Sequence, residues 1–204
     1  MVIGGTDTSS NTIEFAMAHI MNEPKVMRRV LEELDCIVGK NSTVKDSHIP
    51  KLPYLLAVMK ETLRLHPIAP FLIPHCPSET TIVDRYTIPK GSTLFVNVWA
   101  IQRDPSVWDN PLQFDPTSFL DARNYKGNDF NYLPFGSGRR ICAGMDMAEK
   151  TFLYCIATLM HLYEWKLPQG QKLDMSEKFG LTLRKKVPLV AIPTPRLSDI
   201  SLYE

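Results

Sequence analysis

Single prolines divide this sequence into short segments, and their placement limits the folds that are open to it. The 204 residues include 16 prolines, which are scattered along the chain rather than gathered in one tract. Proline has no amide hydrogen and fixes its own φ, so it is tolerated in the first turn of a helix but breaks a helix from within. We therefore interpret the prolines as boundaries between many short elements.

Four of these segments have the pattern of helices. Residues 11–23 place apolar side chains on one face. A second helix is expected to begin at Pro24 and to end near Gly39, and a third to run from Pro53 to Pro67. A strongly apolar fourth helix is expected over residues 143–163.

Short runs of β-forming residues separate these helices. Residues 82–83, 86–88 and 93–96 read as strands, with a turn at 89–91 between the last two. Residues 181–183 and 189–192 have the composition of a further hairpin. Together with the helices, these runs predict a mainly α fold with small β-sheets.

Residues 99–134 are rich in Pro, Asp and Asn and carry aromatic side chains at intervals. Aromatic side chains favour burial, so we expect an ordered meander in which all of them are covered. The aromatic residues concerned are Trp99, Trp108, Phe114, Phe119, Phe130 and Tyr132.

Composition narrows the class of protein. Hydrophobic residues make up 44% of the chain and the net charge is +1, as in an ordinary globular domain with no bulk attraction to nucleic acid or anionic lipid. The four cysteines are widely spaced, which argues against a zinc ribbon, a thioredoxin-like site or a disulfide framework. We expect no signal peptide, and the most apolar run, residues 152–162, is about half the length of a membrane span.

The segment Phe135 to Gly144 carries the strongest chemical signal and reads FGSGRRICAG. Gly136 and Gly138 give access to backbone conformations that other residues avoid. Cys142 lies just before an apolar helix, whose unpaired N–H groups and dipole favour a thiolate. Arg140 adds a fixed positive charge that suits a carboxylate. Local chemistry alone leaves a second interpretation open, a free core cysteine beside a glycine turn.

The spacing of five residues in this segment resembles the haem-binding signature of the cytochrome P-450 superfamily, in its plant microsomal type. These residues are Phe135, Gly138, Arg140, Cys142 and Gly144. The resemblance implies a cytochrome P-450 fold in which residues 1–204 are the C-terminal haem-binding part. It also implies that Cys142 is the axial thiolate ligand of the iron of haem b and that Arg140 binds a haem propionate.

Two further stretches match the same family. Glu61 and Arg64 are three residues apart on the third expected helix and can pair. By itself such a pair is usually exposed and weak, but the resemblance implies a buried structural pair that holds the meander. The family completes this network with an arginine in a Pro-Glu-Arg-Phe motif, where this chain has Ser118. Either Arg123 compensates for the missing arginine or the network is weaker.

The first residues resemble the oxygen-activation motif of the family. The Thr8 hydroxyl can bond back to the Gly4 carbonyl in a helix, and the resemblance makes Asp7 and Thr8 the residues that relay protons to bound dioxygen. Alone, this stretch also fits a flexible tail with a helix N-cap. His75 matches a second propionate-binding position, although a lone histidine is commonly just a surface or core residue.

Two apolar stretches, residues 68–73 and 179–182, match segments that face the substrate in the family, although core packing explains them equally well. The resemblance thus implies a monooxygenase that inserts one oxygen atom from dioxygen into a hydrophobic small molecule. The sequence of the meander, including the segment from Trp99 to Trp108, is most similar to that of plant members of the family that modify flavonoids or terpenoids. Electrons would come from NADPH through cytochrome P-450 reductase, at the cytosolic face of the endoplasmic reticulum membrane.

Chains of this family are more than twice as long as this one, so we expect a C-terminal portion without the N-terminal half or the membrane anchor. Such a portion is expected to bind haem poorly, because half of a haem pocket leaves apolar surface exposed to water. Two alternatives follow from this: an inactive haem-binding fragment, or a helical interaction module that binds no haem.

Overall fold

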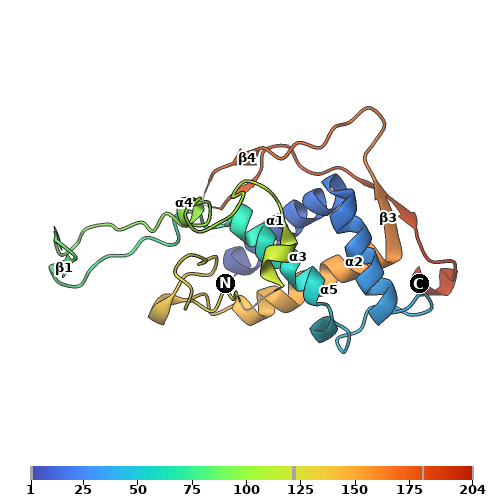
Figure 1. Ribbon diagram of the computed structural model, residues 1–204, viewed down its shortest axis with the longest axis horizontal. Coiled ribbons are helices and arrows are strands. Elements are labelled where there is room, and N and C mark those ends of the chain that lie inside the picture. Colours follow the sequence, from blue (N-terminus) through green and yellow to red (C-terminus); the bar gives the residue numbers. More distant parts are fainter. Residues whose placement is uncertain (1, 121–122, 181, 204) are drawn as a thin grey trace.

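The computed structural model describes residues 2–120, 123–180 and 182–203. Within them, four long helices cross one another at the centre of the molecule (Figure 1). They are α1 (Val2–Asn22), α2 (Pro24–Ile37), α3 (Pro53–Leu65) and α5 (Met145–Leu162). The connections contain the short helix α4 (Val98–Ile101) and the 3-10 turns η1 (Ile49–Lys51), η2 (Pro116–Phe119) and η3 (Gly138–Arg140), and a further 3-10 turn, η4 (Ile200–Tyr203), follows the last strand.

The strands form small antiparallel pairs at the edge of this helical body. β1 (Thr81–Val83) pairs with β2 (Tyr86–Ile88) near the tip of a long arm that projects from the helices (Figure 1). β3 (Tyr163–Lys166) pairs with β6 (Ile192–Pro195), and β4 (Glu177–Lys178) with β5 (Arg184–Lys185). The prediction of a mainly α fold with small sheets is confirmed.

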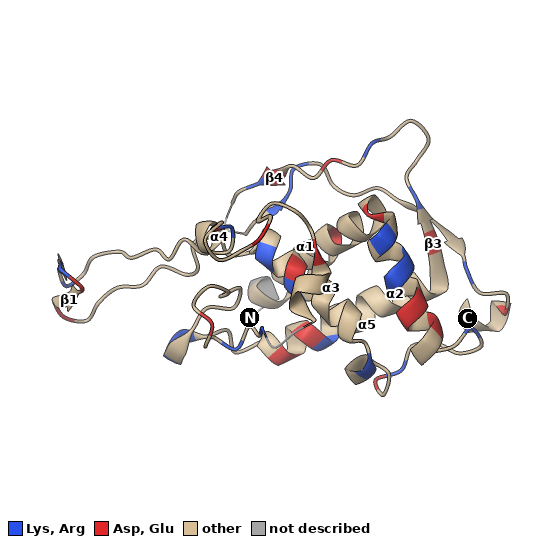
Figure 2. Ribbon diagram, in the orientation of Figure 1, with Lys and Arg blue, Asp and Glu red and all other residues tan. Residues whose placement is uncertain are grey.

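Helix α3 is the centre of the core. Ten of its thirteen residues are buried, and it packs against α1, α5 and the turn η2. Pro53 stands in its first turn, where no amide hydrogen is needed. Leu55 and Val58 are fully buried, and each such side chain stabilises the fold by about 1.5–3 kcal/mol. Helix α2 buries one face. It also carries both basic and acidic residues, which are blue and red in Figure 2.

Helix α1 is longer than its hydrophobic pattern predicts. Apolar periodicity begins at residue 11, but the helix already begins at Val2. In these turns threonine hydroxyl groups satisfy themselves on carbonyls four residues earlier: Thr8 Oγ1 donates to Gly4 O at 2.7 Å and Thr12 Oγ1 to Thr8 O at 2.8 Å. The alternative of a flexible tail over these residues is therefore wrong.

Two strand predictions are wrong. Residues 93–96 form no strand, and only Leu94 makes an isolated bridge, to His75. The expected hairpin of residues 181–183 with 189–192 is absent from the described residues, and residue 181 lies outside them. Residues 192–195 instead pair with the strand that follows α5. The prediction failed because apolar composition indicates that a segment forms a strand but does not determine which strand it pairs with.

The meander buries only part of its aromatic residues. Trp108, Phe114, Phe119 and Tyr132 are buried as expected, whereas Trp99 is 40% and Phe130 69% exposed. Trp99 keeps one ring face covered by the guanidinium of Arg103, whose central carbon lies 4.1 Å from the ring centroid. A cation over the ring face stabilises a half-exposed indole without burying it in the core.

Candidate haem-binding site

The loop that carries Cys142 is closed by a backbone hydrogen bond. The amide of Cys142 donates to the carbonyl of Phe135 at 2.9 Å, and Phe135 is anchored edge-on against Tyr125 with ring centroids 5.4 Å apart. Gly136 and Gly138 have φ values of +77° and +65°, which strain any residue with a Cβ. The sequence therefore needs glycine at both positions to bring Cys142 back beside Phe135.

The thiol of Cys142 is exposed at the start of α5, three positions before Met145. A Cβ added at Gly144 would lie 3.9 Å from the Cys142 sulfur, so the glycine keeps the space beside the thiol open. The sulfur is thus presented by a glycine-rich loop, as the sequence predicts.

The chemistry of Cys142 fits the protein ligand of a haem iron. Within the described ranges no group of three or more His, Cys, Asp and Glu side chains comes together as a metal site. A porphyrin supplies four nitrogen ligands to its iron and needs only an axial ligand from the protein, which one accessible thiolate provides. Arg140 and His75 are both exposed cations or potential cations, a chemical type suited to propionates.

Glu61 and Arg64 form a buried bidentate ion pair. Arg64 donates from Nε and Nη2 to the two carboxylate oxygens of Glu61 at 2.7 and 2.8 Å, and both side chains are almost completely buried. The remaining Arg64 donors bond to the carbonyls of Gln102, Pro111 and Gln113 at 2.7–3.0 Å. Burial raises the pKa of Glu61, and the guanidinium of Arg64 opposes that rise. The pair ties the meander to α3.

A cavity of about 290 Å³ lies beside this pair, where Ser118 replaces the arginine of the family motif. Arg123 also lines the cavity, but its guanidinium lies over the ring of Trp108 at 4.1 Å, and its ion-pair partner is Asp129 at 4.0 Å. Arg123 Nη1 and Trp108 Nε1 are buried without a hydrogen-bond partner in the described part of the chain. Arg123 therefore contacts the ring of Trp108 and pairs with Asp129, and it does not replace the missing arginine as a partner of Glu61.

Replacing Ser118 with arginine is expected to stabilise the protein. A guanidinium in the cavity can donate to the carboxylates of Glu61 and Asp115, which line it, and charge-assisted hydrogen bonds of this kind contribute about 1.5–3 kcal/mol. Urea unfolding followed by circular dichroism measures the gain. Ser118→Lys is the matched control, because an ammonium lacks the planar fork and should give less than half of the effect. Equal gains from both variants would contradict the prediction.

Asp7 and Thr8 lie in the first half of α1. The hydrogen bond from Thr8 to the Gly4 carbonyl is present in the form predicted from the sequence. Asp7 is exposed, and its backbone carbonyl accepts from Ser10 Oγ at 3.2 Å. The helix continues unbroken through this motif, so both side chains are held on a regular element.

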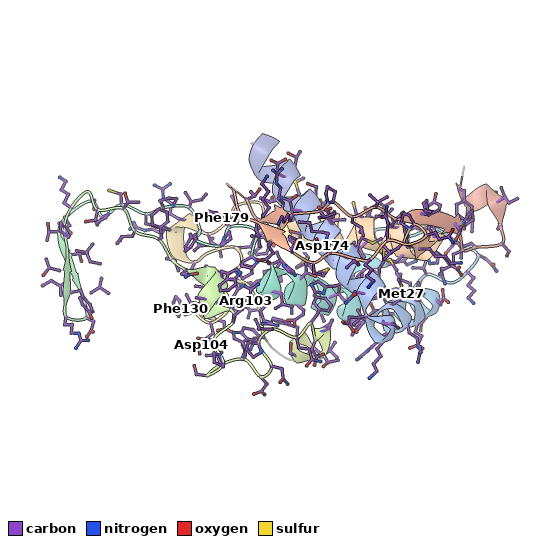
Figure 3. All side chains as sticks on the ribbon, turned by 90° about the horizontal axis from the view of Figure 1, so that it is seen from above. Met27, Arg103, Asp104, Phe130, Asp174 and Phe179 are labelled. Carbon is purple, nitrogen blue, oxygen red and sulfur yellow. The ribbon has the colours of Figure 1, made fainter. Side chains whose placement is uncertain are left out.

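The two apolar stretches of the sequence come together in the structure. Phe71 meets Phe179 edge-on with ring centroids 5.8 Å apart, and meets Phe95 in the same way at 6.1 Å. All three rings are at least one-third exposed, and Figure 3 shows Phe179 near the base of the arm. Sequence reasoning missed Phe95, which was assigned to a strand. Leu181 lies outside the described residues.

Sequence reasoning also missed a buried pair of histidines. His19 of α1 and His66, which follows α3, place their Nε2 atoms 2.8 Å apart. The Nδ1 atom of His66 lies 2.5 Å from a carboxylate oxygen of Glu177 in β4. Burial, then His66 and Lys185, lower the pKa of His19 to about 2, and burial also lowers the pKa of His66 despite Glu177. No local sequence motif predicts this contact, because His19, His66 and Glu177 are far apart in the sequence.

Acid is expected to destabilise the protein through His19 well above the pH at which carboxylates titrate. The unfolded chain takes up a proton at His19 near pH 6.5 and the folded chain does not, so stability present above pH 6.5 is lost as the pH falls. Between pH 7.5 and 5.5 the loss from His19 alone is about 1.4 kcal/mol. Urea titrations at the two values measure it. His19→Gln keeps an Nε2 donor but does not titrate; equal pH dependence in both proteins would contradict the assignment.

Known proteins resemble this chain in sequence and in fold. A family model described as Cytochrome P450 matches residues 1–191. Flavonoid 3',5'-hydroxylase 2 of Petunia hybrida is 50% identical over 204 residues, which cover 98% of this chain and 40% of that protein. A flavonoid 3'-monooxygenase of Crocosmia x crocosmiiflora is 48% identical over 202 residues, covering 95% and 40%. This chain thus spans about 40% of the length of these relatives.

A solved structure gives the same result for the fold. A zebra fish cytochrome P450 with abiraterone superposes with a TM-score of 0.85 and 34% sequence identity, covering 95% of this chain and 45% of that one. The helices and small sheets described above are therefore arranged as in part of that larger molecule.

Proposed function

The chain belongs to the cytochrome P450 family, and on this premise we propose that residues 1–204 are the C-terminal haem-binding part of a monooxygenase. The reaction is the insertion of one oxygen atom from dioxygen into a hydrophobic small molecule, with reduction of the other atom to water. The observation that carries the proposal is the glycine-rich loop that presents the exposed thiol of Cys142 at the start of α5.

In this proposal the thiolate of Cys142 would bind the haem iron, and Arg140 and His75 would hold the propionates. Haem, when bound, would supply an iron that binds dioxygen, with electron donation from the thiolate that favours cleavage of the O–O bond. Phe135 fixes the return of the loop, because its carbonyl accepts a hydrogen bond from the Cys142 amide. Gly138 supplies a positive φ to the loop, and Gly144 keeps the space beside the sulfur open.

Asp7 and Thr8 are the proposed proton-handling residues. The Thr8 hydroxyl proton is held by the Gly4 carbonyl at 2.7 Å, so the hydroxyl oxygen remains free to accept a further hydrogen bond. A water molecule near the exposed carboxylate of Asp7 can exchange protons with solvent. Together they can pass a proton from solvent toward a ligand that lies against α1.

The substrate class we propose is a plant secondary metabolite with an aromatic or terpenoid skeleton. It is supported by the flavonoid-hydroxylating relatives and by the exposed rings of Phe71, Phe95 and Phe179, which offer edges and faces to a flat apolar ligand.

The proposed electron donor is NADPH–cytochrome P450 reductase, and the proposed location is the cytosolic face of the endoplasmic reticulum membrane. None of the helices in the described part of the chain is both long and apolar enough to cross a bilayer.

The test is to express the chain with a haem supply, reduce it, add carbon monoxide and record the Soret band. A red-shifted band of the thiolate type supports the haem site, and NADPH-dependent oxidation of a flavonoid in the presence of reductase then supports the monooxygenase. A thiolate-type band without turnover would indicate an inactive haem-binding fragment. Absence of haem uptake would leave a helical interaction module.

A further inference from the structure

The histidine pair belongs to a hydrogen-bonded chain whose direction follows from chemistry. The carboxylate of Glu177 only accepts, so Nδ1 of His66 must carry a hydrogen and donate to it across 2.5 Å. With both imidazoles neutral, Nε2 of His66 is then bare and accepts the hydrogen of His19 Nε2 across 2.8 Å. The order of donation is His19 to His66 to Glu177.

Aromatic rings hold both imidazoles in place. Phe15 stacks on His66 with centroids 4.0 Å apart, and Phe114 stacks on His19 at 3.9 Å, each within 6° of parallel. His19 and His66 are each less than 10% exposed. Stacking fixes the plane of each ring, and the contacts with His19 and Glu177 set which nitrogen of His66 faces which partner, so one arrangement of hydrogen bonds links α1 to β4.

Burial lowers the pKa of His66, and two neighbouring cations lower it further, whereas Glu177 raises it. The guanidinium of Arg103 lies 3.6 Å from the Glu177 carboxylate and donates to the Leu65 carbonyl just before His66. The Lys185 ammonium approaches from β5, 5.9 Å from the ring centroid of Phe15. Two cations beside His66 oppose its protonation, while the anion of Glu177 is paired by both His66 and Arg103.

Glu177 is the link between this core and the Phe179 turn. It begins β4, two residues before Phe179, and β4 and β5 are only two residues long each. A hairpin this short is marginal on its own. Other attachments of the hairpin are the amide of Leu183, which donates to the carbonyl of Ile68 at 2.9 Å, and Thr182, which accepts from Asn11 at 3.4 Å.

We propose that His66 is a positioning residue: through Glu177 it fixes the β4–β5 hairpin, and with it the Phe179 ring, in register with His19 of α1. The substrate part of this proposal rests on the proposed function, because it takes Phe179 as part of the substrate wall. The anchoring part depends only on contacts in this chain.

Two amide variants distinguish the hydrogen bond that His66 makes through Nδ1 from the one that it makes through Nε2. In His66→Asn the side-chain NH₂ lies near the position of Nδ1 and can still donate to Glu177. In His66→Gln the amide reaches the position of Nε2 and can still accept from His19, but Glu177 loses the donor on residue 66 and keeps only its other contacts, among them Arg103. Glu177→Leu is a third variant, at a partly exposed strand position, that leaves the buried histidine pair intact.

Amide hydrogen exchange, read by mass spectrometry on the protein without haem or substrate, tests the anchor. We expect peptides over residues 174–187 to exchange about tenfold faster in His66→Gln and Glu177→Leu, a change of about 1.4 kcal/mol in opening free energy. The same peptides should be unchanged in His66→Asn, and peptides of α2 unchanged in all three. Equal exchange in the Asn and Gln variants, or a uniform rise across the chain, would overturn the anchor.

A second measurement tests the substrate part separately. The Kd of a flavone, followed by quenching of tryptophan fluorescence, should rise at least fivefold in His66→Gln and Glu177→Leu and remain constant in His66→Asn. A loosened hairpin with unchanged flavone affinity would overturn the positioning role. Absence of flavone binding to the unaltered protein would count against the proposed function, while the exchange data would still decide the anchor.

Discussion

Cys142→Ser is expected to abolish the thiolate-type spectrum of the haem-loaded protein completely. Serine keeps the size and the backbone of the residue, so the loop bond from residue 142 to Phe135 should persist. A hydroxyl does not ionise at neutral pH and donates little electron density, so the band of the carbon monoxide complex should lose its red shift. Activity that depends on this ligand should fall to background.

The matched control is Cys76→Ser, since Cys76 is also a free and exposed thiol in the described structure. It should retain the spectrum in full, and both variants should unfold within about 0.5 kcal/mol of the unaltered protein because exposed substitutions cost little. A red-shifted band that survives in Cys142→Ser would refute the ligand assignment.

Arg64→Ala is expected to cost about 3–5 kcal/mol of stability, the range for breaking a buried ion pair from one side. The variant leaves the Glu61 carboxylate buried without its counter-ion and removes the donors to three meander carbonyls. Since domains of this size are stable by about 5–15 kcal/mol, the loss is a large share of the total. The variant should be partly unfolded at 37 °C or bind no haem.

Urea unfolding of Arg64→Ala beside Arg28→Ala gives the measurement and its control. Arg28 is an exposed arginine of α2, and its removal should change stability by less than about 0.5 kcal/mol. The double variant Glu61→Leu/Arg64→Met should cost less than the sum of the two single variants, because no lone buried charge remains. A loss below about 1 kcal/mol in Arg64→Ala would mean that the pair is dispensable.

Elements marked by local chemistry were predictable from the sequence. Pro24 and Pro53 mark the starts of α2 and α3 within one residue, because proline has few tolerated places in a helix. The glycines around Cys142 mark a loop with positive φ values. Local sequence rules were sufficient where the residue that determines a helix start or a turn lies within a few residues of it.

Features that depend on distant partners were not predictable in the same way. His19, His66 and Glu177 come from three segments and carry no joint pattern, although together they form one hydrogen-bonded group in which burial lowers the pKa of both histidines. The pairing of residues 192–195 with the strand after α5 was missed for the same reason. In both cases the contact depends on how distant segments are arranged in the fold. The hydrophobic periodicity of one segment carries no information about that arrangement.

The prolines of β6 have a consequence for self-association. The amide of Arg196 donates to Leu162 at 2.8 Å, so positions 192, 194 and 196 face β3, and Pro193 and Pro195 face the open edge of the two-stranded sheet. That edge therefore lacks two of the donors that an incoming strand would need. At this edge, strand addition, the first step of edge-to-edge aggregation, is opposed by the same residue type that starts α2 and α3.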